Sequence, residues 1–228
     1  SIGQHAGDVV IINRAGRVEH FQEFYRKMLT PADKYSARVN DIIQIEITRK
    51  CDLFTCSNCT RLLPFRKDTL EMSLDVFERA VESLADWPGV VAVFGGNPCL
   101  HSAFVDICRI LARHVPPERR GLWTNHTRYH GALCRETFHA GRLNLNAHGD
   151  RAAFEEMARW FPGRVIHGTD RRMSWHAGIL VDWRDMGLSP EDWRQGREAC
   201  DINQKWSAII QERDRQAVAY FCEVAGSI

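Results

Sequence analysis

Three cysteines crowd into nine positions of the chain, at Cys51, Cys56 and Cys59. Thiolates are ligands for zinc and for iron–sulfur clusters, and eight cysteines in 228 residues are too dilute for a disulfide scaffold. Three thiolates on one short loop can hold three corners of a cube of iron and sulfide, which leaves the fourth iron without a protein ligand. The amino and carboxylate groups of a small molecule can chelate that open iron. The triplet therefore predicts a metal centre in a reducing compartment.

The spacing of the triplet leaves two other kinds of site open. Gaps of four and then two residues are also those of plant-type two-iron ferredoxins, and three cysteines with a fourth ligand can hold structural zinc. A plant-type ferredoxin is smaller and β-rich, and no fourth zinc ligand is obvious between Lys50 and Glu71. A non-catalytic iron–sulfur or zinc-binding protein, with an electron-transfer or structural role, stays as the alternative.

Strand and helix patterns alternate along the chain, and the first strong strand leads straight into the cysteine loop. Apolar and polar residues alternate over 41–48, which is typical of a strand. Alternation of about six strand and helix units predicts an α/β protein with a parallel sheet and helices outside it, in barrel or doubly wound form. Further strands are predicted at 90–94, 122–125, 143–147, 164–167 and 176–182, and helices after Ser73, around Phe104, at 133–138, around Phe154 and after Ser189.

Polar segments follow four of the predicted strands. They are the cysteine loop, the turn 95–98, the pair Thr124 and Asn125, and the segment 144–148. Ligands collect at the carboxyl ends of parallel strands in barrels and in doubly wound sheets. The four segments therefore predict one site at one edge of the sheet.

The cysteine loop and these turns together resemble the radical S-adenosylmethionine superfamily, in which a three-cysteine loop follows the first strand of a partial (β/α)6 barrel. The family's Gly-Gly-Glu-Pro turn after the second strand binds the methionine amino group, and Gly95, Gly96, Asn97 and Pro98 occupy its place. Segments 123–127 and 143–147 are similar to the ends of its third and fourth strands. Asn144 falls at the position that contacts the ribose or carboxylate of the cofactor.

The resemblance runs from about residue 41 to 195 and implies an oxidoreductase with a partial (β/α)6 TIM-type barrel. It implies that Cys51, Cys56 and Cys59 hold a 4Fe-4S cluster, which cleaves S-adenosylmethionine to a 5′-deoxyadenosyl radical that takes hydrogen from a substrate. It also implies an external one-electron reductant of flavodoxin or ferredoxin type. Whether the substrate is a peptide, a carbohydrate or a small metabolite is not indicated.

Three features depart from the family's pattern. Four residues instead of three separate Cys51 from Cys56, and Asn58 replaces the aromatic residue that usually precedes the last cysteine. Phe54 is the candidate for the adenine contact that this aromatic makes. Asn97 replaces glutamate, which removes a charge that would pair with the amino group.

Cys200 and Cys222 lie in a segment that resembles the start of the auxiliary-cluster extension called SPASM or twitch, where a small hairpin separates two cluster cysteines. This implies a second iron–sulfur cluster, with two structural thiols as the alternative. We therefore expect an N-terminal extension at 1–40, the barrel at 41–195 and a C-terminal extension at 196–228.

The remaining candidate residues have ordinary interpretations beside functional ones. Glu46 shares a strand face with Thr48, where it could hold a substrate or serve the core rim or surface. Histidines near predicted strand ends could move protons near neutral pH, although such a residue more often only makes hydrogen bonds within the fold. These histidines are His126, His148 and His167, and the cysteines that we expect to serve packing are Cys99, Cys108 and Cys134.

The charge balance gives no long-range attraction for nucleic acid or for anionic membranes. Lys and Arg total 30 against 29 Asp and Glu, a formal charge of +1. No stretch approaches the ~20 apolar residues of a membrane helix, and the first residues show no secretory pattern. We expect a soluble cytoplasmic protein that recognises its substrate locally.

Overall fold

The computed structural model describes residues 10–12, 18–20, 42–53, 59, 61, 63, 68–168 and 208–220. Its strands are β1 (Val10–Ile12), β2 (Val18–His20), β3 (Ile42–Thr48), β4 (Val90–Gly95), β5 (Arg120–Thr124), β6 (Leu143–Asn146), β7 (Ile166–His167), β8 (Ala208–Arg213) and β9 (Gln216–Tyr220). Its α-helices are α2 (Leu74–Glu82), α3 (Phe104–His114), α4 (Gly131–Thr137) and α5 (Arg151–Trp160), with short 3-10 turns η2 (Pro98–Leu100), η3 (Pro117–Arg119) and η4 (Ala140–Arg142).

The strands form one mostly parallel sheet in the order β2-β1-β9-β8-β3-β4-β5-β6-β7. From β8 to β7 every neighbouring pair is parallel, whereas β8 and β9 are antiparallel, as are β1 and β2. The predicted α/β class with a parallel sheet is therefore confirmed. Closure into a partial barrel stays a prediction, as does the strand at 176–182, which lies outside the described residues.

The predicted elements between 41 and 167 are present, with strand ends shifted by at most two residues. Ser73 is the N-cap residue of α2, but its hydroxyl makes no capping bond. Instead the backbone N–H and hydroxyl of Ser73 both donate to the Glu212 carboxylate, at 2.6 and 3.0 Å. A contact from the strand β8 therefore takes the place of a side-chain cap at the start of α2.

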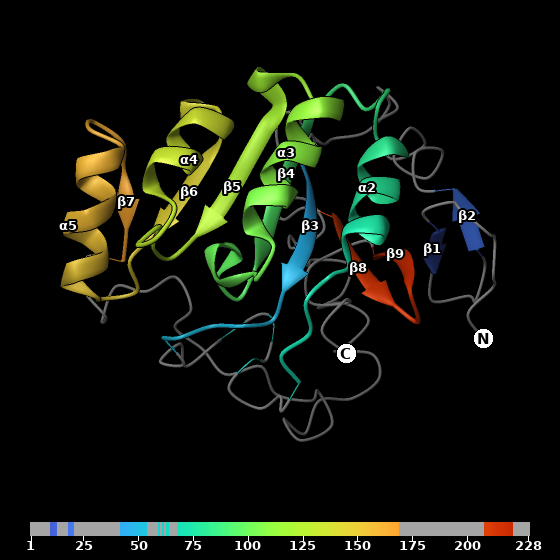
Figure 1. Cartoon of the computed structure of the whole chain (residues 1–228), viewed down its shortest axis with the longest axis horizontal. Coiled ribbons are helices and arrows are strands. Elements are labelled where there is room, and N and C mark those ends of the chain that lie inside the picture. Colours follow the sequence, from blue (N-terminus) through green and yellow to red (C-terminus); the bar gives the residue numbers. More distant parts are fainter. Residues whose placement is uncertain are drawn as a thin grey trace, which may run out of the picture.

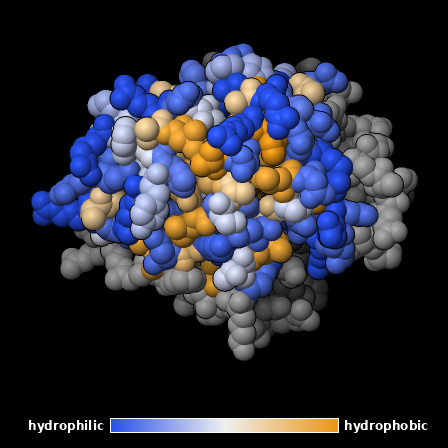
Figure 2. Space-filling model, viewed as in Figure 1, coloured by the Kyte–Doolittle hydropathy of each residue, from blue (hydrophilic) through white to orange (hydrophobic). Residues whose placement is uncertain are grey.

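Helices α2 to α5 lie together on one face of the sheet (Figure 1). The apolar residues of β3 face them, because Ile43, Ile45 and Ile47 are fully buried in a core shared with α2 and α3. The outer surface that these helices present is largely hydrophilic, with apolar groups scattered in it (Figure 2). The helix partners of the β3 isoleucines in this core include Val76, Phe77, Ala80, Val81, Phe104, Ile107 and Leu111.

The opposite face of β3 is polar and yet buried. Gln44, Glu46 and Thr48 are at most 3% exposed. Burying a polar group is costly unless it is hydrogen-bonded, so this face requires partners from other segments. A surface role for Glu46 is thereby excluded.

The hairpin β8–β9 joins the same sheet. Strand β8 pairs in parallel with β3, with Gln44 opposite Ile209. The tip residues Asp214 and Arg215 have φ values of 50° and 60°, the left-handed pair that a two-residue hairpin turn requires. The hairpin predicted between Cys200 and Cys222 is therefore present, although both cysteines lie outside the described residues.

Candidate functional site

The loops after β3, β4 and β5 meet at the carboxyl edge of the sheet. The backbone N–H of Asn97, after β4, donates to the carbonyl of Lys50 at 2.7 Å. The side-chain Nδ2 of Asn125, after β5, lies 3.8 Å from the Sγ of Cys51. Three of the four polar segments predicted to share one edge are thus in contact, as expected of parallel strands.

Two glycines allow the β4 turn to approach the cysteine loop closely. The N–H of Gly96 donates to the Thr48 carbonyl at 2.9 Å. A Cβ at Gly96 would lie 2.2 Å from the Lys50 carbonyl oxygen and 3.0 Å from the Cβ of Cys51, and a Cβ at Gly95 would lie 2.2 Å from the Thr48 oxygen. Only glycine permits such an approach, so the two residues fix where the backbone before Cys51 lies.

Gly96→Ala should push the backbone before Cys51 away from the β4 turn. We expect it to lower the free energy of unfolding by roughly 1–3 kcal/mol, as overpacking does, and to reduce iron uptake. Urea unfolding and iron analysis measure the two effects. Gly141→Ala is the matched control, because its nearest atoms belong to the movable His139 side chain, at 3.2 and 3.3 Å. Equal effects of the two substitutions would contradict this role of Gly96.

The side chain of Asn97 is buried at the centre of this edge. Its Oδ1 accepts bonds from the Cys99 N–H at 3.0 Å and from the Thr124 hydroxyl at 2.9 Å, and its Nδ2 donates to the backbone carbonyl of His126 at 3.4 Å. Asn97 has no exposed surface. The residue holds the turns after β4 and β5 together, and its side chain is not presented to a ligand here.

Asp52 and His126 form a pair across the site. The Nε2 of His126 lies 2.7 and 2.9 Å from the two carboxylate oxygens of Asp52. His126 is fully buried, whereas the Asp52 side chain is 37% exposed. The pair therefore connects the interior of the edge with its surface directly beside Cys51.

The described part of the cysteine triplet fits a metal-bound thiolate site. Cys51 lies at this edge, and Cys51 and Cys59 are both partly exposed, while Cys56 and Phe54 lie outside the described residues. The Asn125 Nδ2 donor faces the Cys51 sulfur, and hydrogen bonds to ligand sulfurs are one of the factors that tune iron–sulfur clusters. The donor set and the glycine turn are therefore compatible with a cluster held at this loop.

An ion pair between Lys50 and Glu71 also holds the start of the cysteine loop. The Nζ of Lys50 lies 2.9 Å from the Glu71 carboxylate, which also accepts bonds from the backbone N–H and hydroxyl of Ser102. Burial raises the pKa of Glu71, but the hydrogen bonds from Lys50 and Ser102 outweigh it and hold this pKa below its ordinary value. The loop base is therefore anchored to the segment before α3.

A buried ion pair joins β3 to Arg61, two positions after the third cysteine. The guanidinium of Arg61 donates two bonds of 2.8 Å to the carboxylate of Glu46. The side chains of Arg61 and Glu46 are 2% and 1% exposed. Arg61 also lies 5.7 Å from the ring centroid of Phe94. Glu46 thus has a partner inside the fold, and its suggested role in holding a substrate stays a prediction.

The remaining predicted site residues are described by their strand or turn and their exposure. Asn144 is exposed and its Cα pairs with that of Trp123 between β6 and β5. Pro98 is buried at the start of η2. His167 is exposed at the end of β7. Cys200 and Cys222 lie outside the described residues, so a second cluster stays a prediction.

Three cysteines are buried behind the site. Cys99, Cys108 and Cys134 are at most 3% exposed, and the sulfurs of Cys99 and Cys134 lie 3.8 Å apart. Burial raises the pKa of Cys108 to about 12, and the contact with Cys99 together with burial raises that of Cys134. Their position in the core supports the interpretation of Cys108 as a packing residue.

The raised pKa of Cys108 predicts a loss of stability at alkaline pH. Between the ordinary cysteine pKa of about 8.5 and the folded value of about 12, the unfolded chain loses this proton while the folded protein keeps it. The free energy of unfolding should therefore fall as pH rises through this range, by up to about 1.4 kcal/mol per pH unit. Urea unfolding from pH 8 to 10 should show a smaller fall for Cys108→Ala, and equal slopes would contradict the assignment.

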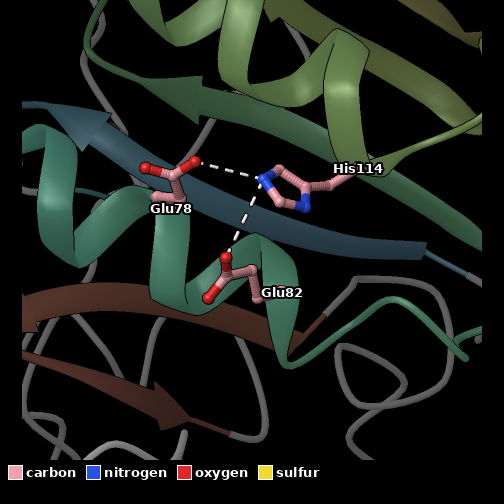
Figure 3. Close-up of side chains that lie close together, drawn as sticks. All are labelled: Glu78, Glu82 and His114. Atoms are coloured by element: carbon pink, nitrogen blue, oxygen red, sulfur yellow. Dashed lines mark hydrogen bonds and ion pairs between the residues drawn. The ribbon is translucent and has the colours of Figure 1, made fainter.

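A second group of ionisable side chains lies away from this edge, between α2 and α3 (Figure 3). The Nε2 of His114 is 3.2 Å from Glu78 and 4.0 Å from Glu82, and the three ligand-type atoms lie within 4.8 Å of one another. Arg113 also contacts the same Glu78 oxygen, at 3.3 Å. Because a guanidinium already neutralises Glu78, we interpret the group as an ion-pair network that joins the two helices.

The sequence analysis did not single out Asp52 or Arg61, and it gave His126 an ordinary interpretation beside a role in proton transfer. Asp52 follows the first cysteine and Arg61 stands two positions after the third, so proximity to the triplet was a usable signal for both. Their partners lie 74 and 15 positions away. No local pattern identifies such pairs.

Among the described residues, none of the helices has the length and apolar character of a membrane span.

No family model and no curated protein matches the chain. Its structure is similar to the crystal structure of BtrN in complex with AdoMet and 2-DOIA, with a TM-score of 0.43, 16% sequence identity, and coverage of 75% of this chain and 70% of that chain. Likeness at this level establishes neither a family nor a reaction.

Proposed function

We propose that this chain is a radical S-adenosylmethionine enzyme, with a 4Fe-4S cluster held by Cys51, Cys56 and Cys59. One observation carries the proposal. The three-cysteine loop follows a central parallel strand, β3, and the backbone just before it is hydrogen-bonded to the glycine turn that follows the neighbouring strand β4. When bound, the cluster supplies one electron that splits S-adenosylmethionine into methionine and a 5′-deoxyadenosyl radical, which takes hydrogen from the substrate.

The residues of this edge would position and shield the bound groups. Gly95 and Gly96 allow the β4 turn to lie against the loop base, and Asn125 donates toward the Cys51 sulfur. Proximity and exclusion of water are the main contributions that a protein makes to radical chemistry of this kind. The remaining candidates for contact with S-adenosylmethionine are Pro98, Asn144, Phe54 and, through its backbone, Asn97.

The proposal also covers the domain organisation, a second cluster, the electron donor and the substrate. We infer a partial (β/α)6 barrel over 41–195, flanked by extensions at 1–40 and 196–228, and a cytoplasmic location. Cys200 and Cys222 are the candidates for a second cluster next to the hairpin β8–β9. A flavodoxin-type or ferredoxin-type protein would supply the electron, and the substrate is a peptide, a carbohydrate or a small metabolite.

The test is anaerobic reconstitution with iron and sulfide, followed by incubation with S-adenosylmethionine and a chemical reductant. We expect bound iron and sulfide in equal amounts and 5′-deoxyadenosine that forms only when the reductant and the cluster are both present. Protein that has not been reconstituted is the control. Zinc without sulfide would instead support a structural metal site, and a stable cluster that never yields 5′-deoxyadenosine would support an electron-transfer protein.

A further inference from the structure

Two dipeptides lie side by side at the carboxyl edge. Cys51 and Asp52 follow β3, and Asn125 and His126 follow β5. Asn125 contacts the Cys51 sulfur and His126 contacts the Asp52 carboxylate, so each residue of one dipeptide has a partner in the other. The carboxylate of Asp52 is therefore held in place beside the first cysteine of the triplet.

The Asp52 carboxylate keeps capacity to accept further hydrogen bonds. A carboxylate offers about four acceptor sites, and among the described residues the Asp52 carboxylate contacts the His126 Nε2 and, at 3.9 Å, a guanidinium nitrogen of Arg128. Arg128 itself is paired more closely with Asp150. The Asp52 side chain is also 37% exposed, so a ligand can reach it.

Other described carboxylates around this edge already serve the fold. Each accepts hydrogen bonds from a cation or from backbone N–H groups, and the buried ones cannot turn outward without leaving a buried partner unsatisfied. They are Glu46 with Arg61, Glu71 with Lys50 and Ser102, Asp150 with Arg128 and the start of α5, and Glu156 with Thr127.

A second acceptor next to Cys51 has no partner in the described part of the chain. The side chain of Asn125 is only 5% exposed, and its buried Oδ1 makes no hydrogen bond there. Its Nδ2 faces the Cys51 sulfur, which sets the orientation of the amide. An unsatisfied buried acceptor costs roughly 1–3 kcal/mol, and a ligand with N–H donors would remove that cost.

We propose that Asp52 and Asn125 form a subsite for a primary amino group beside Cys51, with His126 as the residue that positions Asp52. An amino group suits the subsite because it carries several N–H donors, and here a partly exposed anion and a buried neutral acceptor flank the same cysteine. Asn97 does not compete for this role, since its own amide is engaged and has no exposed surface. The inference rests on the proposed function, under which the group is the α-amino group of S-adenosylmethionine.

The test compares binding of S-adenosylmethionine with binding of its analogue that has hydrogen in place of the α-amino group. Both dissociation constants are measured by equilibrium dialysis on anaerobically reconstituted protein, normalised to bound iron. Asp52→Asn should weaken binding of S-adenosylmethionine by about tenfold or more and leave the analogue almost unaffected. Asp52→Glu, which keeps the charge, should recover part of the difference.

Asp106→Asn is the matched control, because Asp106 is an exposed carboxylate on α3 that pairs with Arg109. It should leave both constants unchanged. If Asp52→Asn binds its full iron and still prefers S-adenosylmethionine over the analogue as strongly as the wild type does, the subsite is wrong while the proposed function stands. If wild-type protein with a full cluster binds neither compound, the proposed function fails and the subsite fails with it.

Discussion

Replacing Cys51, Cys56 and Cys59 together by Ala should abolish the brown absorbance and the bound iron of the anaerobically reconstituted protein, or leave only the smaller signal of an auxiliary cluster. Thiolates are the only ligands in the proposal that hold the cluster, and alanine offers no donor atom in their place. Absorption spectra with iron and sulfide analysis measure the loss. The same variant should form no 5′-deoxyadenosine.

The matched control replaces Cys99, Cys108 and Cys134 by Ala. It removes the same number of sulfurs, but from the core behind the site, so it should lower stability and keep the iron. Iron that stays bound after replacement of the triplet would overturn the assignment, unless it disappears when Cys200 and Cys222 are also replaced. That second outcome would locate an additional cluster at those two residues.

The elements that carry the site could be predicted because their signals are local. Strand β3 alternates isoleucine with polar residues, and the burial of Ile43, Ile45 and Ile47 against α2 and α3 follows from that period. The glycines at 95 and 96 could be assigned to a turn, and the structure supplies the reason, which is the backbone of Lys50 2.2 Å from a Cβ at Gly96.

The pairing of distant segments could not be predicted. Nothing in the local pattern of β8 says that Ile209 would lie opposite Gln44, because strand pairing depends on which partners fill the rest of the sheet. The structural role of Asn97 could not be predicted either. Its type suggested a weakened ligand contact, whereas its partners Cys99, Thr124 and His126 come from two turns that only the folded chain brings together.

Breaking the ion pair between Glu46 and Arg61 should have the largest effect on stability of any single change discussed. Glu46→Leu removes the buried carboxylate that pairs with the Arg61 guanidinium at 2.8 Å and with that of Arg49 at 3.5 Å, and breaking a buried pair by removing one partner costs about 3–5 kcal/mol. Arg61→Met should cost less, because the Arg49 guanidinium stays 3.5 Å from the Glu46 carboxylate. The double variant should cost much less than the sum, because it removes both charges of the pair together. Urea unfolding of the four proteins gives the coupling energy.

Glu155→Ala removes a carboxylate from a similar contact on the surface of α5, where Arg151 and Glu155 are 2.8 Å apart but 91% and 58% exposed. Exposed pairs contribute about 0–1 kcal/mol, so this control separates the effect of burial from that of charge. If Glu46→Leu costs no more than Glu155→Ala, the Glu46 carboxylate is not buried as described.

The same variants should also alter the cysteine loop, because the ion pair joins its two ends. Glu46 precedes Cys51 by five positions and Arg61 follows Cys59 by two, so the contact holds β3 and the far end of the loop at a fixed separation. Without it, the entropy of the loop opposes convergence of the thiolates on one cluster. We therefore expect each single variant to bind less iron than the wild type, even under conditions where it is fully folded. Glu155→Ala should bind as much iron as the wild type, and undiminished iron in both Glu46→Leu and Arg61→Met would show that the loop is held by other contacts.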